Sequence, residues 1–114
     1  MKVSVVIPAL NEEGLIEECL KSIRRQNQPV ELILIDNGSI DRTPEIARSF
    51  CDNVYIKPDF SLAEMRDFGV RKATGDIIVT TDADCVAPEN WISNLIEPFE
   101  DPSVVAVGGA FRPL

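Results

Sequence analysis

The sequence predicts an α/β protein, a three-layer sandwich in which helices cover both faces of a mainly parallel sheet. Two observations predict this class: five short apolar runs alternate with four segments of helical periodicity, and the apolar runs contain few polar residues. Runs without polar alternation are typical of strands that are covered on both faces. The length of 114 residues and the hydrophobic fraction of 45% suit a single domain, residues 1–114.

The expected strands are rich in β-branched residues and end where the chain turns polar or small. Pro8 closes the first strand, because proline cannot donate a ladder hydrogen bond. Gly108 stops the last strand. The five expected strands span residues 3–7, 32–35, 54–56, 77–79 and 104–107.

The first two expected helices have recognisable starts. Acidic residues begin the first helix and basic residues end it, as the helix dipole favours, and Asn11 is the simplest candidate for its N-cap. Thr43 and Pro44 are typical of an N-cap followed by proline at the first helical position. The second helix is therefore expected to begin after Thr43.

The third and fourth expected helices have clear apolar faces. The third spans residues 62–73 and stops at Gly75. The fourth begins near Pro88 and carries Pro98 close to its end, so it is expected to kink or stop early.

The order βαβαβαβαβ, with right-handed crossovers, gives a mainly parallel sheet. In such sheets, ligands bind beyond the carboxyl ends of the strands. The polar segments that follow the first, second and fourth strands are therefore the candidate functional loops.

Charge excludes several partners. The chain has 11 basic and 19 acidic residues, a net charge of −8, and such a surface repels nucleic acid and anionic lipid. We expect no nucleic-acid partner, and an anionic ligand would need a metal ion or a local group of donors. No apolar run approaches the ~18 residues of a membrane span, so we expect no membrane-spanning segment.

The side-chain inventory restricts the chemistry further. The chain has no His, which excludes His-based triads and His metal ligands. Cys19, Cys51 and Cys85 are odd in number and form no C-x-x-C spacing, which argues against a disulfide scaffold or a zinc site. This cysteine usage indicates a reducing compartment, and we expect a cytoplasmic protein.

The loop after the second strand has two interpretations. It contains an Asn-Gly turn signal, and Asp41 or Thr43 can cap the next helix, so it can be a turning loop only. The functional interpretation places Asp36 or Asn37 against a nucleoside, because carboxylates and amides pair with base or ribose donors. The loop lacks the G-x-G-x-x-G and P-loop fingerprints.

The loop after the fourth strand contains two carboxylates, Asp82 and Asp84. Their spacing places the two backbones about 7 Å apart at a strand end, close enough to approach one hard cation directly or through water. The small Ala83 between them would let a ligand approach the backbone. A cation here would bridge to diphosphate oxygens. The structural alternative is a pair of solvated Asp residues that start a turn.

Three further residues belong near these loops. Arg66 either forms a surface pair with Glu64 or Asp67 or contributes a positive charge to the site. Cys85 is expected to be a half-buried packing thiol, not a nucleophile. Trp91 is expected to fill the core on its helix face.

Four motifs in this order resemble the family 2 glycosyltransferases of the GT-A fold, whose nucleotide-binding half is Rossmann-like. Residues 3–12 are similar to the family's opening strand and Pro-x-x-Asn-Glu loop, and residues 34–43 to its Asp-Asp-Gly-Ser-Thr-Asp-Gly-Thr segment. Residues 66–69 and 73–76 resemble its Arg-Asn-x-Gly and Ala-x-Gly-Asp stretch, and residues 82–84 match its D-x-D. The resemblance covers essentially the whole chain.

The resemblance implies a site for a nucleotide-diphospho-sugar donor. Asp82 and Asp84 match the pair that holds ribose, diphosphate and a divalent cation, Mg²⁺ or Mn²⁺. Asn37 stands where the family usually has an Asp that contacts the base, and Asp67 replaces the usual Asn. The donor-binding positions implied by the resemblance are Pro8, Ala9, Glu12, Asn37, Arg66, Asp82, Ala83 and Asp84.

The resemblance also implies inverting transfer to a sugar or lipid acceptor, at the cytoplasmic membrane face if the acceptor is a lipid. Family members continue for roughly a hundred further residues, which supply the acceptor site and the carboxylate general base. In this chain, acceptor-binding structure would begin at residues 108–114, and no catalytic base can be named. We therefore expect the 114-residue chain to bind donor but to transfer sugar slowly or not at all.

Two other functions are weighed against this one. A non-catalytic module that binds a nucleotide or nucleotide-sugar stays open, because no general base is identified. A sugar nucleotidyltransferase is disfavoured, because it needs a Gly-rich, basic loop after the first strand and residues 8–13 are the opposite. Self-association is expected if the last strand or an apolar face is uncovered.

Overall fold

The computed structural model describes residues 1–109 and contains a four-stranded, all-parallel sheet with the strand order β3-β2-β1-β4. This arrangement confirms the predicted α/β class. Acceptor-binding structure was expected to begin at residues 108–114, and residues 110–114 lie outside the described residues. The elements are β1 (Val3–Ala9), α1 (Ile16–Arg24), β2 (Val30–Asp36), α2 (Thr43–Arg48), β3 (Asn53–Ile56), α3 (Leu62–Lys72), β4 (Ile77–Thr80), α4 (Trp91–Ile96) and the 3-10 helix η1 (Glu97–Glu100).

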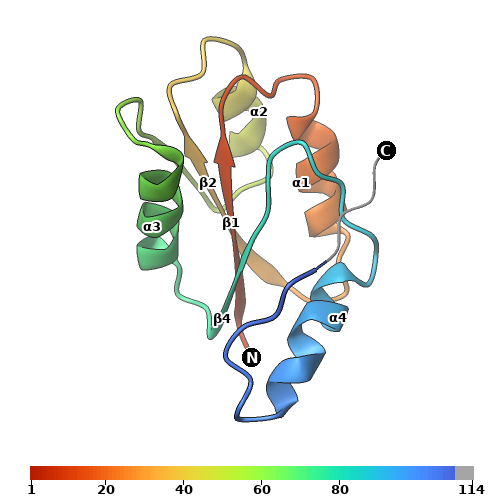
Figure 1. Ribbon diagram of the computed structural model, residues 1–114. Helices are drawn as coiled ribbons and strands as arrows, with labels where there is room; N and C mark the ends of the chain where they lie inside the picture. The colour runs from red at the N-terminus through yellow and green to blue at the C-terminus, as the bar shows by residue number, and fades with distance from the viewer. Residues whose placement is uncertain (110–114) are drawn as a thin grey trace.

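Helices cover the sheet on both faces, which gives the three layers (Figure 1). In Figure 1, α3 lies on one side of β1, and α1, α2 and α4 lie on the other. Two apolar clusters fill the interfaces: Val5, Ile7 and Leu34 belong to the cluster under α1 and α2, and Val6 and Ile35 belong to the cluster under α3. Alternate residues of one strand thus enter opposite clusters, as the pleat requires.

Coverage on both faces holds for the central strands only. Every residue of β1 and the last five of β2 are buried, whereas β4 alternates between buried and exposed positions. Ile78 of β4 remains 38% exposed. β4 and β3 are the edge strands of the sheet, so each is flanked by a strand on one side only.

β1 extends two residues beyond the predicted end and includes Pro8. The last β4 partner of β1 is Thr80, which pairs with Val6, so Pro8 lies where only β2 flanks the strand. A proline is tolerated where one side of a strand has no partner. The carboxyl end of β1 therefore extends past the end of β4 and is paired with β2 alone.

Two predicted helix starts are wrong. Asn11 does not cap α1: its backbone is left-handed, with φ 52°, and the helix begins later, at Ile16. Thr43 is the first residue of α2 and not its N-cap. The N-cap is Arg42, which makes no side-chain cap hydrogen bond, and Asp41 accepts a hydrogen bond from the Thr43 backbone N–H just before the helix.

The end of the fourth helix matches its prediction. α4 stops at Ile96 and the chain continues as the 3-10 helix η1, with Pro98 near its start. Proline removes a hydrogen bond from a helix interior, so the tighter turn is the expected outcome.

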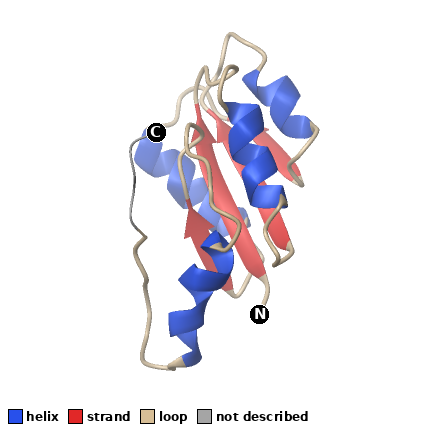
Figure 2. Ribbon diagram, turned by 90° about the vertical axis from the view of Figure 1, so that its right-hand side faces the viewer, coloured by secondary structure: helices blue, strands red, loops and turns tan. Residues whose placement is uncertain are grey.

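The fifth predicted strand is wrong. Within residues 1–109, no strand is formed by residues 104–107, and Figure 2 draws the segment leading to the grey C-terminus as loop. A cavity of about 430 Å³ separates this segment from the edge of β4, and Val105 is 91% exposed. A strand requires a ladder partner, and β4 lies across the cavity from these residues.

No helix among residues 1–109 combines the length and the apolar character that a membrane crossing requires.

Candidate donor and metal site

The loops after β1 and β2 are joined by hydrogen bonds beyond the carboxyl ends of the strands. The Asn11 side chain accepts from the Ile40 N–H at 2.9 Å, and the Asn11 N–H donates to the Ser39 hydroxyl at 2.8 Å. The Glu12 N–H donates to the buried Thr43 hydroxyl at 2.8 Å. These contacts explain the left-handed backbone of Asn11, since its side chain and N–H both reach the neighbouring loop. The two loops are therefore joined into one rim.

Asp36 fixes the start of the second loop. Its carboxylate is 1% exposed and accepts hydrogen bonds from the Gly38 and Ser39 N–H groups at 3.0 and 2.7 Å. Gly38 adopts φ 85° and lies so close to Pro58 that an added Cβ would be 2.9 Å from the proline Cβ. Asp36 thus shapes the turn, and its oxygens are occupied by this chain's own donors.

Asn37 faces the segment after β3. Its side-chain nitrogen donates to the Lys57 carbonyl at 2.9 Å and to the Phe60 carbonyl at 2.8 Å. Its backbone N–H donates to the Ala9 carbonyl at the end of β1. The amide nitrogen of Asn37 is therefore committed to holding residues 57–60, which the sequence did not predict.

Arg66 and the acidic loop after β4 come together from different elements. Arg66 of α3 donates to Asp82 at 3.2 Å, and their side chains are 43% and 48% exposed. The surface pairs that were the structural alternative are not formed: Asp67 pairs with Arg71, and Glu64 caps α3 by a capping box with Ser61. The sequence thus predicted Arg66 near the site, and in the structure its guanidinium forms an ion pair with Asp82.

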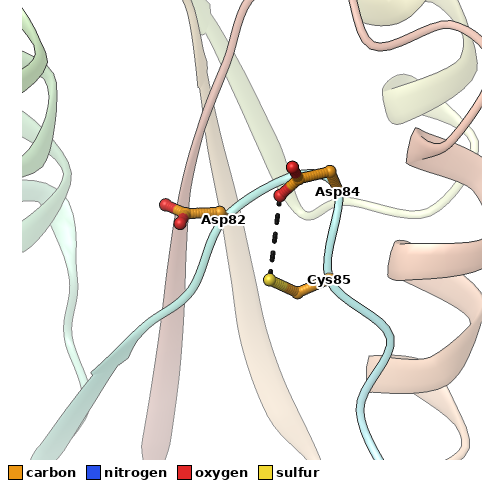
Figure 3. A group of neighbouring side chains, drawn as sticks. All are labelled: Asp82, Asp84 and Cys85. Atoms are coloured by element: carbon orange, nitrogen blue, oxygen red, sulfur yellow. Dashed lines mark hydrogen bonds between the residues drawn. The ribbon is translucent and has the colours of Figure 1, made fainter. Parts of the chain in front are cut away.

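The acidic loop holds a third potential ligand, Cys85. One ligand atom each from Asp82, Asp84 and Cys85 lie within 4.8 Å of one another, and Sγ of Cys85 is 3.7 Å from Oδ1 of Asp84. Figure 3 shows Asp84 and Cys85 joined by this contact, while the Asp82 carboxylate extends on the other side of the loop. Burial raises the pKa of the Cys85 thiol, and the charge of Asp84 raises it further.

Ala83 has a packing role. It is 3% exposed and belongs to the cluster beneath α1. Its inward side chain anchors the loop, so the flanking carboxylates of Asp82 and Asp84 are left at the surface. The Asp82 carbonyl also accepts a hydrogen bond from the buried Cys19 thiol at 3.6 Å. The middle residue of the D-x-D pattern thus packs into the core.

Acidic groups crowd this edge of the sheet. Burial raises the pKa of the Glu12 carboxyl above its ordinary value, and the charges of Asp84 and Asp41 raise it further. Electrostatic repulsion between carboxylates is relieved by a bound cation. Two carboxylates within reach of each other, with a raised pKa on a third, suit a divalent metal ion that takes oxygen ligands.

Comparison with known protein families identifies the family of this chain. The family described as Glycosyl transferase family 2 matches residues 4–113. This chain belongs to glycosyl transferase family 2. The sequence resemblance is thereby confirmed, and the GT-A, Rossmann-like fold is confirmed by solved structures of glycosyltransferases.

Relatives of this family 2 chain include glycosyltransferase AglE of Haloferax volcanii, with 35% identity over 94% of the chain and 38% of the relative. Mannosyltransferase PcManGT from Pyrobaculum calidifontis, solved in complex with GDP-Man and Mn²⁺, has TM-score 0.84 and 31% identity over 90% of the chain and 33% of that protein. Glucosyl-3-phosphoglycerate synthase from Mycobacterium tuberculosis, solved with Mn²⁺, UDP and glucosyl-3-phosphoglycerate, has TM-score 0.70 and 31% identity over 86% and 39%. The chain spans less than two fifths of these proteins.

The family 2 chain is thus similar to one transferase solved with GDP-Man and Mn²⁺ and to another solved with UDP and Mn²⁺. The sequence did not predict three features of the site: the contacts of Ser39 and Thr43, which join the loops, and the position of Cys85 beside both carboxylates. Hydroxyls in a turn carry no sequence signal of their own partners.

Proposed function

We propose that this chain binds the nucleotide-diphospho-sugar donor of a glycosyltransferase through a divalent cation, Mg²⁺ or Mn²⁺, held by Asp82 and Asp84. The observation that carries the proposal is the meeting of Arg66, Asp82 and Asp84 beyond the carboxyl end of β4. A cation and a guanidinium side by side suit a diphosphate, which would otherwise be repelled by a chain of net charge −8.

The rim formed by the first two loops is proposed to hold the nucleoside. Glu12 and the backbone at Pro8 and Ala9 lie at the end of β1, beside the loop that starts at Asp36. Ala83 would position the carboxylates from beneath. Asn37 would contact the base through Oδ1, since its nitrogen donates to the Lys57 and Phe60 carbonyls.

The reaction proposed for the whole protein is inverting transfer of the sugar to a sugar or lipid acceptor. The cation would stabilise the charge that develops on the leaving diphosphate. Arg66 supplies a second positive charge at the same end. We place the protein in the cytoplasm, because its three cysteines are free thiols.

A thermal-shift panel tests this proposal and reports the base. UDP, GDP and dTDP sugars are added to the protein with Mn²⁺ and with a chelator. A ligand at about 100 times its Kd should raise Tm by about 10 °C for a protein of this size. We expect the sugars of one base to raise Tm with Mn²⁺ and to lose this effect in chelator. If no donor raised Tm, the proposal would be contradicted.

A further inference from the structure

We infer that Ser22 and Gln26 are positioning residues of the proposed donor site: they hold the segment that carries Asp82 and Asp84 and do not contact the donor themselves. The inference rests on the proposed function, in which the two carboxylates hold a cation. It adds that α1 and the turn after it keep this segment in the conformation that binds the donor.

Three buried side chains on one side of α1 reach the segment between β4 and α4, which lies beside the helix (Figure 1). Cys19, Ser22 and Gln26 are spaced by three and four residues, which places them on the same side of the helix and of the turn that follows it. Their partners lie between residues 82 and 92, in the same order along the chain. One side of α1 thus runs along the whole segment.

Ser22 and its neighbour contact the segment on both sides of the two carboxylates. The Ser22 hydroxyl donates to the Cys19 carbonyl at 2.7 Å, one turn earlier, and accepts from the Ala87 N–H at 2.9 Å. The Cys19 thiol donates to the Asp82 carbonyl at 3.6 Å. The backbone is therefore held at Asp82 and again at Ala87, and Asp84 lies between these two points.

Gln26 holds the end of the same segment. Its side-chain nitrogen donates to the Pro88 carbonyl at 2.7 Å and to the Ser22 carbonyl at 3.0 Å, and its side-chain oxygen accepts from the Ile92 N–H at 3.0 Å. Ile92 is the second residue of α4 and is fully buried. Both polar atoms of the Gln26 amide are thus used to join α1, the acidic loop and the start of α4.

A segment without regular structure needs such contacts to keep one conformation. Residues 81–90 form no helix or strand, and the pair between Asp82 and Arg66 is half exposed, which is a weak restraint. A loop that became ordered only when the donor binds would lose conformational entropy at that step, and its affinity would be lower. The buried hydrogen bonds of Ser22 and Gln26 avoid this loss, because they order the loop beforehand.

Two buried serines allow a matched comparison. The Ser4 hydroxyl donates to Glu31 at 2.7 Å and accepts from the Gly75 N–H at 2.8 Å, at the other end of the sheet. Ser22→Ala and Ser4→Ala should each lower Tm by several degrees, because each removes the acceptor of a backbone N–H. The affinity for Mn²⁺ with nucleotide should fall about tenfold in Ser22→Ala alone, as when groups that support metal ligands are removed.

Bound Mn²⁺ is measured from the electron paramagnetic resonance signal of the free ion, with UDP and, separately, with GDP. Unchanged affinity in Ser22→Ala, or equal losses of affinity in Ser22→Ala and Ser4→Ala, would overturn the inference and leave the donor site intact. If the unmutated protein bound no Mn²⁺ with either nucleotide, the proposed function would fail, and this inference with it.

Trp91, the only tryptophan of the chain, reports on the contacts of Gln26. It is the first residue of α4 and packs against the cluster under α1. In Gln26→Met, the tryptophan emission should shift to longer wavelength and the Mn²⁺ affinity should fall at least tenfold. Gln28→Met is the control, since the Gln28 amide donates to the Met1 carbonyl away from the segment, and it should change neither. Unchanged affinity in Gln26→Met would contradict its positioning role.

Hydrogen exchange of the unmutated protein covers the case in which the variants do not fold. The Ala87 and Ile92 amides should exchange slowly before any ligand is added, because both donate to buried side chains. Mn²⁺ with UDP or GDP should add little to this protection. Fast exchange of these two amides in the free protein, slowed only by the ligand, would show that the donor orders the segment and that α1 does not.

Discussion

The ion pair between Arg66 and Asp82 connects α3 to the loop after β4. Both side chains are nearly half exposed, so water screens the pair and it stabilises the fold by only ~0–1 kcal/mol. A contact that contributes so little to stability can be exchanged at low cost. We infer that Arg66 turns from Asp82 to the diphosphate when a cation occupies the carboxylates.

Arg66→Ala is therefore expected to change binding more than stability. Urea unfolding should shift by less than ~1 kcal/mol, whereas affinity for a Mn²⁺–nucleoside diphosphate should fall roughly tenfold, about the value of one charge-assisted hydrogen bond. Arg71→Ala is the matched control, since Arg71 forms a similar exposed pair with Asp67 on the same helix. Equal affinities of the two variants would remove Arg66 from the site.

Asn37 should contribute to stability as well as to binding. Its nitrogen satisfies the Lys57 and Phe60 carbonyls, and Asn37→Ala leaves these partly buried oxygens without that donor. We expect a loss of about 1–3 kcal/mol in the free energy of unfolding, measured with urea. Asn37→Asp should be destabilising too, because a carboxylate cannot donate to a carbonyl. Unchanged stability in both variants would show that the amide is not needed by the loop.

The helix α3 is fitted to the sheet at Gly69. A Cβ on Gly69 would lie 2.2 Å from Cγ1 of Val6 and 2.8 Å from Cδ1 of Ile35, both on buried central strands. The glycine thus lets the helix approach the sheet closely. That approach places Arg66, one turn earlier on α3, within reach of the loop after β4.

Gly69→Ala should destabilise the protein even though alanine favours helix. Overpacking costs about 1–3 kcal/mol, more than the ~0.5–1 kcal/mol that alanine gains over glycine in a helix. Gly14→Ala is the control, because an added Cβ there meets nothing within 4 Å, and its effect should stay within ~0.5 kcal/mol. Equal unfolding free energies for the two variants would contradict the close packing of α3.

The opposite end of the sheet is held by Glu31 at the start of β2. Its carboxylate accepts from the Ser4 hydroxyl at 2.7 Å and from the Thr74 N–H at 2.9 Å. The Thr74 hydrogen bond is the main reason that the Glu31 pKa lies below its ordinary value of 4.5. β1, β2 and the segment before β4 are thereby joined through one charge.

This network predicts an acid-sensitive contribution to stability. Because the folded pKa is lowered, the contribution is fully present above pH 4.5, the ordinary pKa, and is lost as pH falls through the folded value. Urea unfolding across this range should show the unmutated protein approaching Glu31→Gln in stability as pH falls. A stability difference that is independent of pH below 4.5 would contradict the assignment.

Most of the fold was predictable from the sequence where hydrophobic periodicity and the order of the elements indicate the same structure. The buried runs of β1 and β2, the βα order and the early end of α4 at Pro98 follow from local sequence. The fifth strand failed because apolar composition cannot reveal whether a ladder partner is present. The start of α1 failed because Asn11 contacts a loop almost thirty residues away, a partner that no local pattern specifies.

The sequence predicted which residues belong to the site but not which of them contact one another. The sequence placed Asp82, Asp84 and Arg66 in the loops and helix that meet at one sheet edge, because parallel strands bring their carboxyl ends together. It could not predict that Arg66 selects Asp82 over its helix neighbours, since side-chain pairing depends on how closely α3 approaches the sheet.

The central claim is that an anionic nucleotide binds this acidic protein through a cation at Asp82 and Asp84. The most direct test is calorimetric titration of the nucleoside diphosphate with Mn²⁺ and with excess chelator, using the unmutated protein, Asp84→Asn and the control Asp67→Asn, whose carboxylate pairs with Arg71 away from the loop. We expect tight binding only with Mn²⁺, lost in Asp84→Asn and kept in Asp67→Asn. Equal affinity in chelator, or full binding by Asp84→Asn, would contradict the claim.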